Sequence, residues 1–184
     1  MLLNVLNARH QTINLYTLHK IIPAIIVVAI DQLSKYLIKS KFILFETQSI
    51  IEPFLRFTYI ENSGLAFGLS VGNFDWLLFL VTLIISIYIL YYLISYDKII
   101  MHEALSLSFI LGGAIGNLID RGFKLFGVFD YGGVIDFIDI GLFSDSWRWY
   151  IFNVADLSVS VGITLYIFYS YIYSNLDNIE NETA

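Results

Sequence analysis

Four long apolar segments separated by polar connections dominate the pattern of the chain. The uncharged runs cover residues 21–30, with an apolar extension to 38, and then residues 76–96, 104–119 and 157–176. A helix that crosses the hydrocarbon core of a bilayer needs about 20 mostly apolar residues. The pattern therefore predicts four membrane-spanning helices, at about 19–38, 75–96, 103–120 and 150–174.

The connection between the first two spans carries a different pattern. Residues Phe54–Ile60 alternate in polarity and are rich in β-forming side chains, and Glu61-Asn62-Ser63-Gly64 follows as a turn signal. We expect a β-rich interfacial segment at about 42–70, with its backbone paired or hydrated. The whole is predicted to be a single polytopic membrane domain over residues 1–176, followed by a disordered acidic tail at 177–184.

Composition agrees with a membrane protein and excludes several functions. Of the 184 residues, 58% are hydrophobic and only 14% are charged, and the net charge of −6 argues against nucleic-acid binding. The absence of cysteine excludes disulfides and thiolate chemistry. Arg9 and Lys20 precede an apolar stretch as in a signal peptide, but no small-x-small cleavage pattern follows. A retained first span is expected.

Alternating span directions place the acidic side chains on one membrane face. Because successive spans run in opposite directions, one side of the membrane carries the end of the first span and the start of the second. The same side carries the end of the third span and the start of the fourth. The aspartates at these ends are Asp31, Asp75, Asp120, Asp136 and Asp156. Carboxylates at membrane depth are costly and mark a functional site by default. The three histidines, His10, His19 and His102, fall on the opposite side. We therefore expect neither a metal nor another cofactor, and no Ser–His dyad.

Charged and small residues of the first and third spans have structural interpretations. Asp31 and Lys35 stand at i and i+4, acid first, the favourable order for an ion pair on a helix. Asp120 can pair with Arg121 or with Lys35, and a structural role is favoured for it. Gly112 and Gly116 form a small-xxx-small pair, which allows close helix approach.

Asp136 and Asp156 are the candidates for chemistry. Asp136 lies between bulky apolar residues, and Asp156 follows Asn153 by one helical turn at the mouth of the fourth span. Each could be a helix cap or an interfacial acid. Together they suit acid–base catalysis, because two carboxylates in one low-dielectric site cannot both ionise. The G-x-S-x-G match at residues 68–72 lacks a histidine base on this face and is interpreted as chance.

Five blocks of residues, in order, resemble the lipoprotein signal peptidases (signal peptidase II), the bacterial membrane aspartic peptidases that process prolipoproteins. The resemblance runs over roughly residues 21–170. The blocks are Asp31-Gln-Leu-Ser-Lys35, Asn62-Ser-Gly-Leu-Ala-Phe67, Gly112-Gly-Ala-Ile-Gly-Asn-Leu-Ile-Asp-Arg121, Val134-Ile-Asp-Phe137 and Phe152-Asn-Val-Ala-Asp156.

The resemblance implies a fold class, an all-α membrane protein with four transmembrane helices and a small β-cradle inserted between helices 1 and 2. It places Asp136 and Asp156 on the catalytic pair. The positions that support the site or bind substrate are Asp31, Lys35, Asn62, Asn117, Asp120, Arg121 and Asn153. The implied reaction is hydrolysis of a prolipoprotein immediately before a diacylglyceryl-modified cysteine. The implied setting is the bacterial inner membrane, with cytoplasmic termini and an extracytoplasmic site.

The implied partners are lipidated prolipoproteins, membrane lipid and a cyclic peptide inhibitor of the globomycin type. A monomer is expected. Two features depart from the family pattern. The 122–133 segment is longer than usual and offers Asp130 as a rival to Asp136. Lysine and arginine also favour the carboxylate face, so the positive-inside rule would place that face in the cytoplasm. Because five ordered blocks match the family, we expect the family's orientation, with the carboxylates on the extracytoplasmic face.

Two other classes of function fit parts of the pattern. Membrane carboxylates also serve ion pathways in transporters and proton relays, but there acids line the span interiors, whereas here they gather at one end. A noncatalytic assembly protein could use Gly112 and Gly116 for helix packing, and it would tolerate aspartate substitutions.

Overall fold

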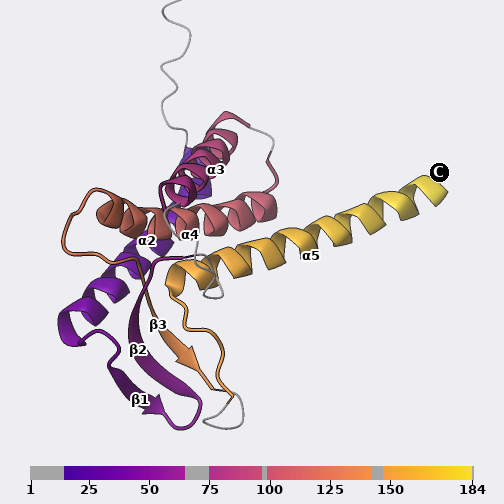
Figure 1. Cartoon of the computed structure of the whole chain (residues 1–184). Helices are drawn as coiled ribbons and strands as arrows, with labels where there is room; N and C mark the ends of the chain where they lie inside the picture. The colour runs from indigo at the N-terminus through magenta and orange to yellow at the C-terminus, as the bar shows by residue number, and fades with distance from the viewer. Residues whose placement is uncertain (1–14, 65–74, 97–98, 142–146, 184) are drawn as a thin grey trace, which may run out of the picture.

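The computed structural model describes residues 15–64, 75–96, 99–141 and 147–183. Within these ranges the chain forms four helices, and Figure 1 shows a small sheet at one end of them. The helices are α2 (Leu15–Lys41), α3 (Asp75–Ser95), α4 (Met101–Leu125) and α5 (Val154–Thr183). The strands are β1 (Thr47–Ile51), β2 (Leu55–Asn62) and β3 (Val134–Ile140).

All four helices are long and apolar enough to cross a membrane, which confirms the predicted fold class. Many of their apolar side chains are exposed, as expected for surfaces that face lipid; Ile25, Leu33 and Ile84 are examples. α4 extends past the predicted end at residue 120 to Leu125. α5 continues to Thr183, so it is helical through the segment from 177 that the sequence predicted to be disordered. No proline or glycine interrupts that segment.

The three strands form one antiparallel sheet in the order β1-β2-β3. The predicted β-rich segment supplies β1 and β2, whereas β3 comes from the connection between α4 and α5 and was not predicted. Four consecutive residues of β3, Val134–Phe137, are buried. A strand buried on both faces lacks the polar alternation by which a strand is recognised in a sequence.

α4 packs between α2 and α5 through its glycines, as the small-xxx-small pattern predicted. A methyl group added at Gly112 would lie 2.9 Å from the carbonyl oxygen of Ala24 in α2. At Gly113 it would meet the backbone of Ala155 in α5. Small residues let helix backbones approach closely, which is how membrane helices gain packing energy. This packing brings the polar residues of α2, α4 and α5 to one end of the bundle, beside the sheet.

A cluster of buried apolar side chains attaches the sheet to the end of α2. Its buried members are Ile38, Tyr59, Ile135 and Phe137. Ile38 comes from α2, and the other three come from β2 and β3. The side chains of β3 are thereby fixed relative to the membrane-spanning helices.

Candidate functional site

The amino terminus of α5 carries a reciprocal cap built from two of the predicted site residues. The Asn153 side-chain oxygen accepts a hydrogen bond from the Asp156 N–H at 2.9 Å. The Asp156 carboxylate in turn accepts from the Asn153 N–H at 3.2 Å. This is a capping box, and it places the Asp156 carboxylate in the first turn, where the helix dipole favours negative charge.

Asp136 lies on β3 and is almost fully buried, with 2% of its surface exposed. The Asn62 amide donates to one carboxylate oxygen at 3.1 Å, and the Asn153 amide donates to the other at 2.7 Å. Burial, and then the nearby charge of Asp156, raise the pKa of Asp136 to about 7. Asp136 is therefore suited to hold a proton near neutral pH.

Two asparagines connect the two aspartates. Asn153 donates its side-chain amide to Asp136 and its backbone N–H to Asp156. Asn117, on α4, donates to Asp156 at 2.7 Å and accepts from the Asn153 amide at 3.1 Å. The carboxylates of residues 136 and 156 thus both accept hydrogen bonds from Asn153, one from its position on β3 and the other from the first turn of α5.

A buried ion cluster lies behind this pair. Lys35, only 1% exposed, donates to Asp31 at 2.8 Å and to Asp120 at 2.9 Å. It also donates to the Asn117 oxygen at 3.0 Å, so it touches the site itself. Of the two partners considered for Asp120, the structure therefore shows Lys35 in contact with it.

The two acids of this cluster also hold backbone. Asp31 accepts from the Ala155 N–H at 2.9 Å, and Asp120 accepts from the Ile135 N–H at 3.1 Å. Each of these donors is adjacent in sequence to one candidate catalytic aspartate. The cluster therefore fixes the start of α5 and the path of β3 at the positions that carry Asp156 and Asp136.

Gln32 lies inside the first family block but was not among the predicted site residues. Its amide donates to Asp31 at 3.2 Å, to Asp120 at 3.1 Å and to the Gly116 carbonyl at 3.1 Å. Two carboxylates against one lysine leave excess negative charge, and these donors help to stabilise it. Gln32 precedes Lys35 by three residues and so lies on the same face of the helix, and this spacing could have predicted its contact with the ion cluster.

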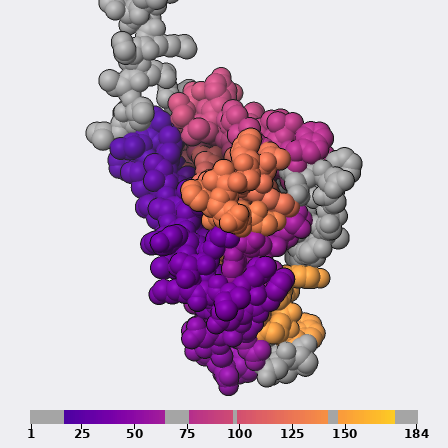
Figure 2. All heavy atoms as spheres, turned by 60° about the vertical axis from the view of Figure 1, so that its left-hand side comes forward, coloured from indigo at the N-terminus to yellow at the C-terminus, as the bar shows by residue number. Residues whose placement is uncertain are grey.

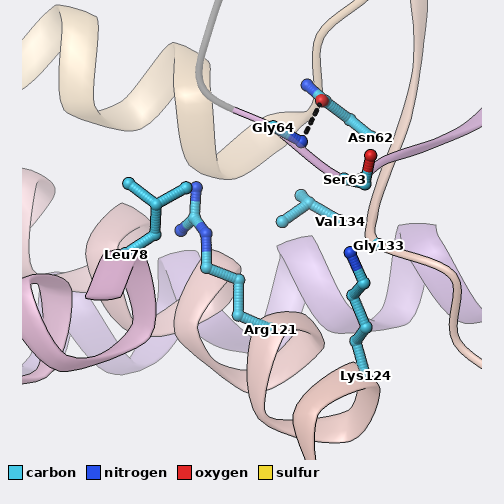
Figure 3. A pocket seen from close by; sticks show the side chains of 8 residues that line it. All are labelled: Asn62, Ser63, Gly64, Leu78, Arg121, Lys124, Gly133 and Val134. Atoms are coloured by element: carbon cyan, nitrogen blue, oxygen red, sulfur yellow. Dashed lines mark hydrogen bonds between the residues drawn. The ribbon is translucent and has the colours of Figure 1, made fainter. Parts of the chain in front are cut away.

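A small pocket opens beside Asn62, as Figure 3 shows. Arg121 and Lys124 extend from α4 toward the Asn62–Gly64 segment, with Leu78 of α3 beside the guanidinium. The remaining lining residues are Ser63, Gly133 and Val134. Because Asn62 both lines the pocket and contacts Asp136, a polar chain bound here would lie beside the aspartate pair.

Other candidates lie apart from this arrangement or outside the described residues. Asp130, the rival carboxylate, is exposed in the connection after α4. The described histidines are His19, in the first turns of α2, and His102, in the first turn of α4, at the helix ends away from the aspartate pair. The G-x-S-x-G match at 68–72 and His10 lie outside the described residues. Asp75 is the first residue of α3.

Chemically, the site combines a buried carboxyl group of raised pKa, a second carboxylate at a helix amino terminus, and fixed amide donors. A pair of carboxyl groups in different environments can divide the roles of general acid and general base. The pocket adds cationic and backbone groups on one side. The arrangement is thus suited to acid–base catalysis beside a pocket with cationic lining.

Comparisons with known proteins identify the family to which the chain belongs. A family model described as signal peptidase (SPase) II matches residues 23–172. The lipoprotein signal peptidase of Syntrophomonas wolfei is 41% identical over 138 residues, 75% of this chain and 83% of that protein. That of Fusobacterium nucleatum is 35% identical over 143 residues, 78% of this chain and 80% of that protein.

A solved structure described as a bacterial membrane enzyme has the same fold. It superposes with a TM-score of 0.69 at 31% sequence identity, covering 88% of this chain and 90% of its own. The family model, the relatives and this structure together confirm the resemblance found in the five sequence blocks. The chain belongs to the signal peptidase II family.

Proposed function

We propose that this protein is a lipoprotein signal peptidase that uses Asp136 and Asp156 as an aspartic pair. Its substrate is a prolipoprotein, cut immediately before a diacylglyceryl-modified cysteine. The observation that carries the proposal is the convergence of both carboxyl groups on Asn153. Family membership supports the substrate class.

In the proposed reaction the two aspartates divide the proton transfers. Asp136, whose pKa is raised to about 7 mainly by burial, donates its proton toward the scissile carbonyl oxygen. Asp156 takes a proton from water, and the resulting hydroxide forms the new bond to the carbonyl carbon. Collapse of the tetrahedral intermediate breaks the C–N bond and returns one hydroxyl proton to Asp136, while the proton held by Asp156 passes to the leaving amine.

The remaining site residues orient the reactants. Asn62 and Asn153 hold the Asp136 carboxyl group by hydrogen bonds to its two oxygens. Arg121 lines the pocket and would contact the substrate backbone there. Enzyme and substrate are both confined to the membrane, so the lipid anchor supplies proximity before any peptide contact forms.

We further propose that the protein acts as a monomer in the bacterial inner membrane, with cytoplasmic termini and an extracytoplasmic site. The family pattern supports this orientation, although lysine and arginine are concentrated near the site. A reporter fused after Ala184 tests it. An extracytoplasmic reporter signal would refute the orientation.

The decisive experiment is incubation of the purified protein with a diacylglyceryl-modified precursor, with and without globomycin. We expect cleavage before the lipidated cysteine and its inhibition by globomycin. Asp136→Asn and Asp156→Asn should each abolish cleavage while the protein stays folded in detergent. Asp130→Asn is the matched control and should retain activity. Near-normal turnover by either of the first two variants would refute the aspartic pair.

The pH dependence of kcat/KM provides a second test. Because Asp136 must be protonated to act as the acid, activity should fall as pH rises through about 7, the pKa of that group. A flat profile from pH 6 to 9 would assign the acid role to another group.

A further inference from the structure

A second polar cluster lies on the opposite side of β2 from Asp136, centred on Glu61. One Glu61 carboxylate oxygen accepts from Lys39 of α2 at 2.7 Å and from the Tyr59 hydroxyl at 2.5 Å. The other oxygen accepts from the Gly132 N–H at 2.6 Å. Burial alone would raise the pKa of Glu61, but these hydrogen bonds outweigh it and hold the pKa below its ordinary value. Glu61 is therefore a charged anchor.

Glu61 and Lys39 together hold the 126–133 segment, which belongs to the 122–133 stretch that the sequence predicted to be longer than the family pattern. Lys39 donates to the Asp130 carbonyl at 3.2 Å and stands 4.5 Å from the centre of the Tyr131 ring. The segment folds back through positive φ angles at Gly127, Phe129 and Asp130. Figure 2 shows it as a lobe, in orange, on the surface formed with α2.

The segment reaches β2 at the residues that border the site. A methyl group added at Gly133 would lie 2.3 Å from the Asn62 carbonyl oxygen, so only glycine permits this approach. The next residue, Val134, begins β3 and pairs with Asn62. Asp136 follows on the same strand. The attachment at Glu61 and Gly132 therefore sets how β3 enters the sheet.

Strand geometry connects this attachment to Asp136. Successive side chains of a strand point to opposite faces, so Glu61 faces Lys39 while Asn62 faces Asp136. The Asn62 amide donates to Asp136 at 3.1 Å, and its own oxygen accepts from the Gly64 N–H at 2.9 Å. A shift of β2 against the segment would move this amide relative to the carboxyl group.

We propose that Glu61 is a positioning residue: by holding Lys39 and the Gly132 backbone, it fixes the 126–133 segment against β2 and keeps the Asn62 amide on Asp136. This inference rests on the proposed function, since it assigns Glu61 a role in that reaction. Glu61 itself touches neither carboxyl group of the pair, so it acts through Asn62.

Glu61→Gln tests the proposal with the lipidated precursor. We expect kcat to fall about tenfold, as small misplacements at an active site do, while KM stays within about twofold. The Asn62 hydrogen bond lowers the pKa of Asp136, so the high-pH limb of the rate profile should move to higher pH. The charged groups that act on Asp136, Lys35 and Asp156, remain unchanged in this variant.

Two further variants serve as controls. Glu52→Gln makes the same change at an exposed position between β1 and β2 and should leave kcat and the pH profile at the wild-type values. Lys39→Arg keeps a cation for Glu61 and should retain most of the activity. The melting temperature of each variant in detergent separates loss of folding from loss of positioning.

The outcomes distinguish this inference from the proposed function. If Asp136→Asn is inactive but Glu61→Gln keeps the wild-type kcat and profile, only the positioning role is refuted. The same holds if kcat falls with no movement of the high-pH limb. If Asp136→Asn is active, the aspartic mechanism itself is wrong.

Discussion

Two lysines one helical turn apart on α2 have very different surroundings. Lys35 is 1% exposed and contacts two buried carboxylates, whereas the Lys39 side chain is 27% exposed and contacts Glu61 beside the connecting segment. The first lies among membrane-spanning helices and the second at their end, where the sheet begins. We therefore expect Lys35 to stabilise the fold, and Lys39 to position the 126–133 segment beside the site.

The difference follows from the dielectric around each cation. Removing one partner of a buried ion cluster leaves uncompensated charge, a large penalty, whereas a partly exposed pair is screened by water. The buried cluster is also attached to three other elements, α4, β3 and α5, through Asp120, Ile135 and Ala155. The effects of substitution should therefore differ in size and in kind.

The largest effect is expected for Lys35→Met. Asp31 and Asp120 would then face each other without a cation, and unfolding in detergent should become easier by about 3–5 kcal/mol. Denaturant or thermal unfolding measures the change. A decrease in the free energy of unfolding of less than about 1 kcal/mol would show that the cluster contributes little to stability.

Gly116→Ala should have an intermediate effect. The added methyl group would lie 2.6 Å from an Asp31 carboxylate oxygen, so it strains the same cluster without removing a charge. We expect a loss of about 1–3 kcal/mol. Gly122→Ala is the matched control, because the nearest atom there, in the Phe79 ring, is 3.4 Å away. Equal losses for the two variants would contradict this account.

Lys39→Met should cost little stability, at most about 1 kcal/mol, because the pair with Glu61 is partly exposed. Its effect should appear in kcat instead, through the 126–133 segment. Parallel unfolding and kinetic measurements separate the two. A stability loss as large as that of Lys35→Met would remove the distinction between the two lysines.

A change in ionic strength should give the smallest difference between the Lys39–Glu61 pair and the buried Lys35 cluster. Raising salt from about 0.1 to 1 M shortens the screening length from about 10 to 3 Å and should weaken the Lys39–Glu61 pair but not the buried cluster. Wild-type kcat should then move part of the way toward that of Glu61→Gln, while the melting temperature of Lys35→Met relative to wild type stays unchanged. The two rates and two melting curves measured across a salt series check this.

The sequence by itself determined the four spans, the family and the set of polar residues at one end. Hydrophobic length fixes a membrane helix strongly, because the bilayer leaves the backbone few alternatives. The five ordered blocks also named the residues that the structure brings together, from Asp31 to Asp156. Gly112 likewise predicted helix approach, since close packing requires a small side chain at the contact.

Only the tertiary structure decided which of these residues touch. Asp120 could pair with either of two cations, and packing of α4 against α2 selected Lys35. β3 was missed because its burial comes from contacts distant in sequence, which erase the alternation of an exposed strand. The roles of Gln32 and Glu61 were likewise hidden, because their hydrogen-bond partners, Asp120 and Gly132, lie about 70 to 90 residues away along the chain.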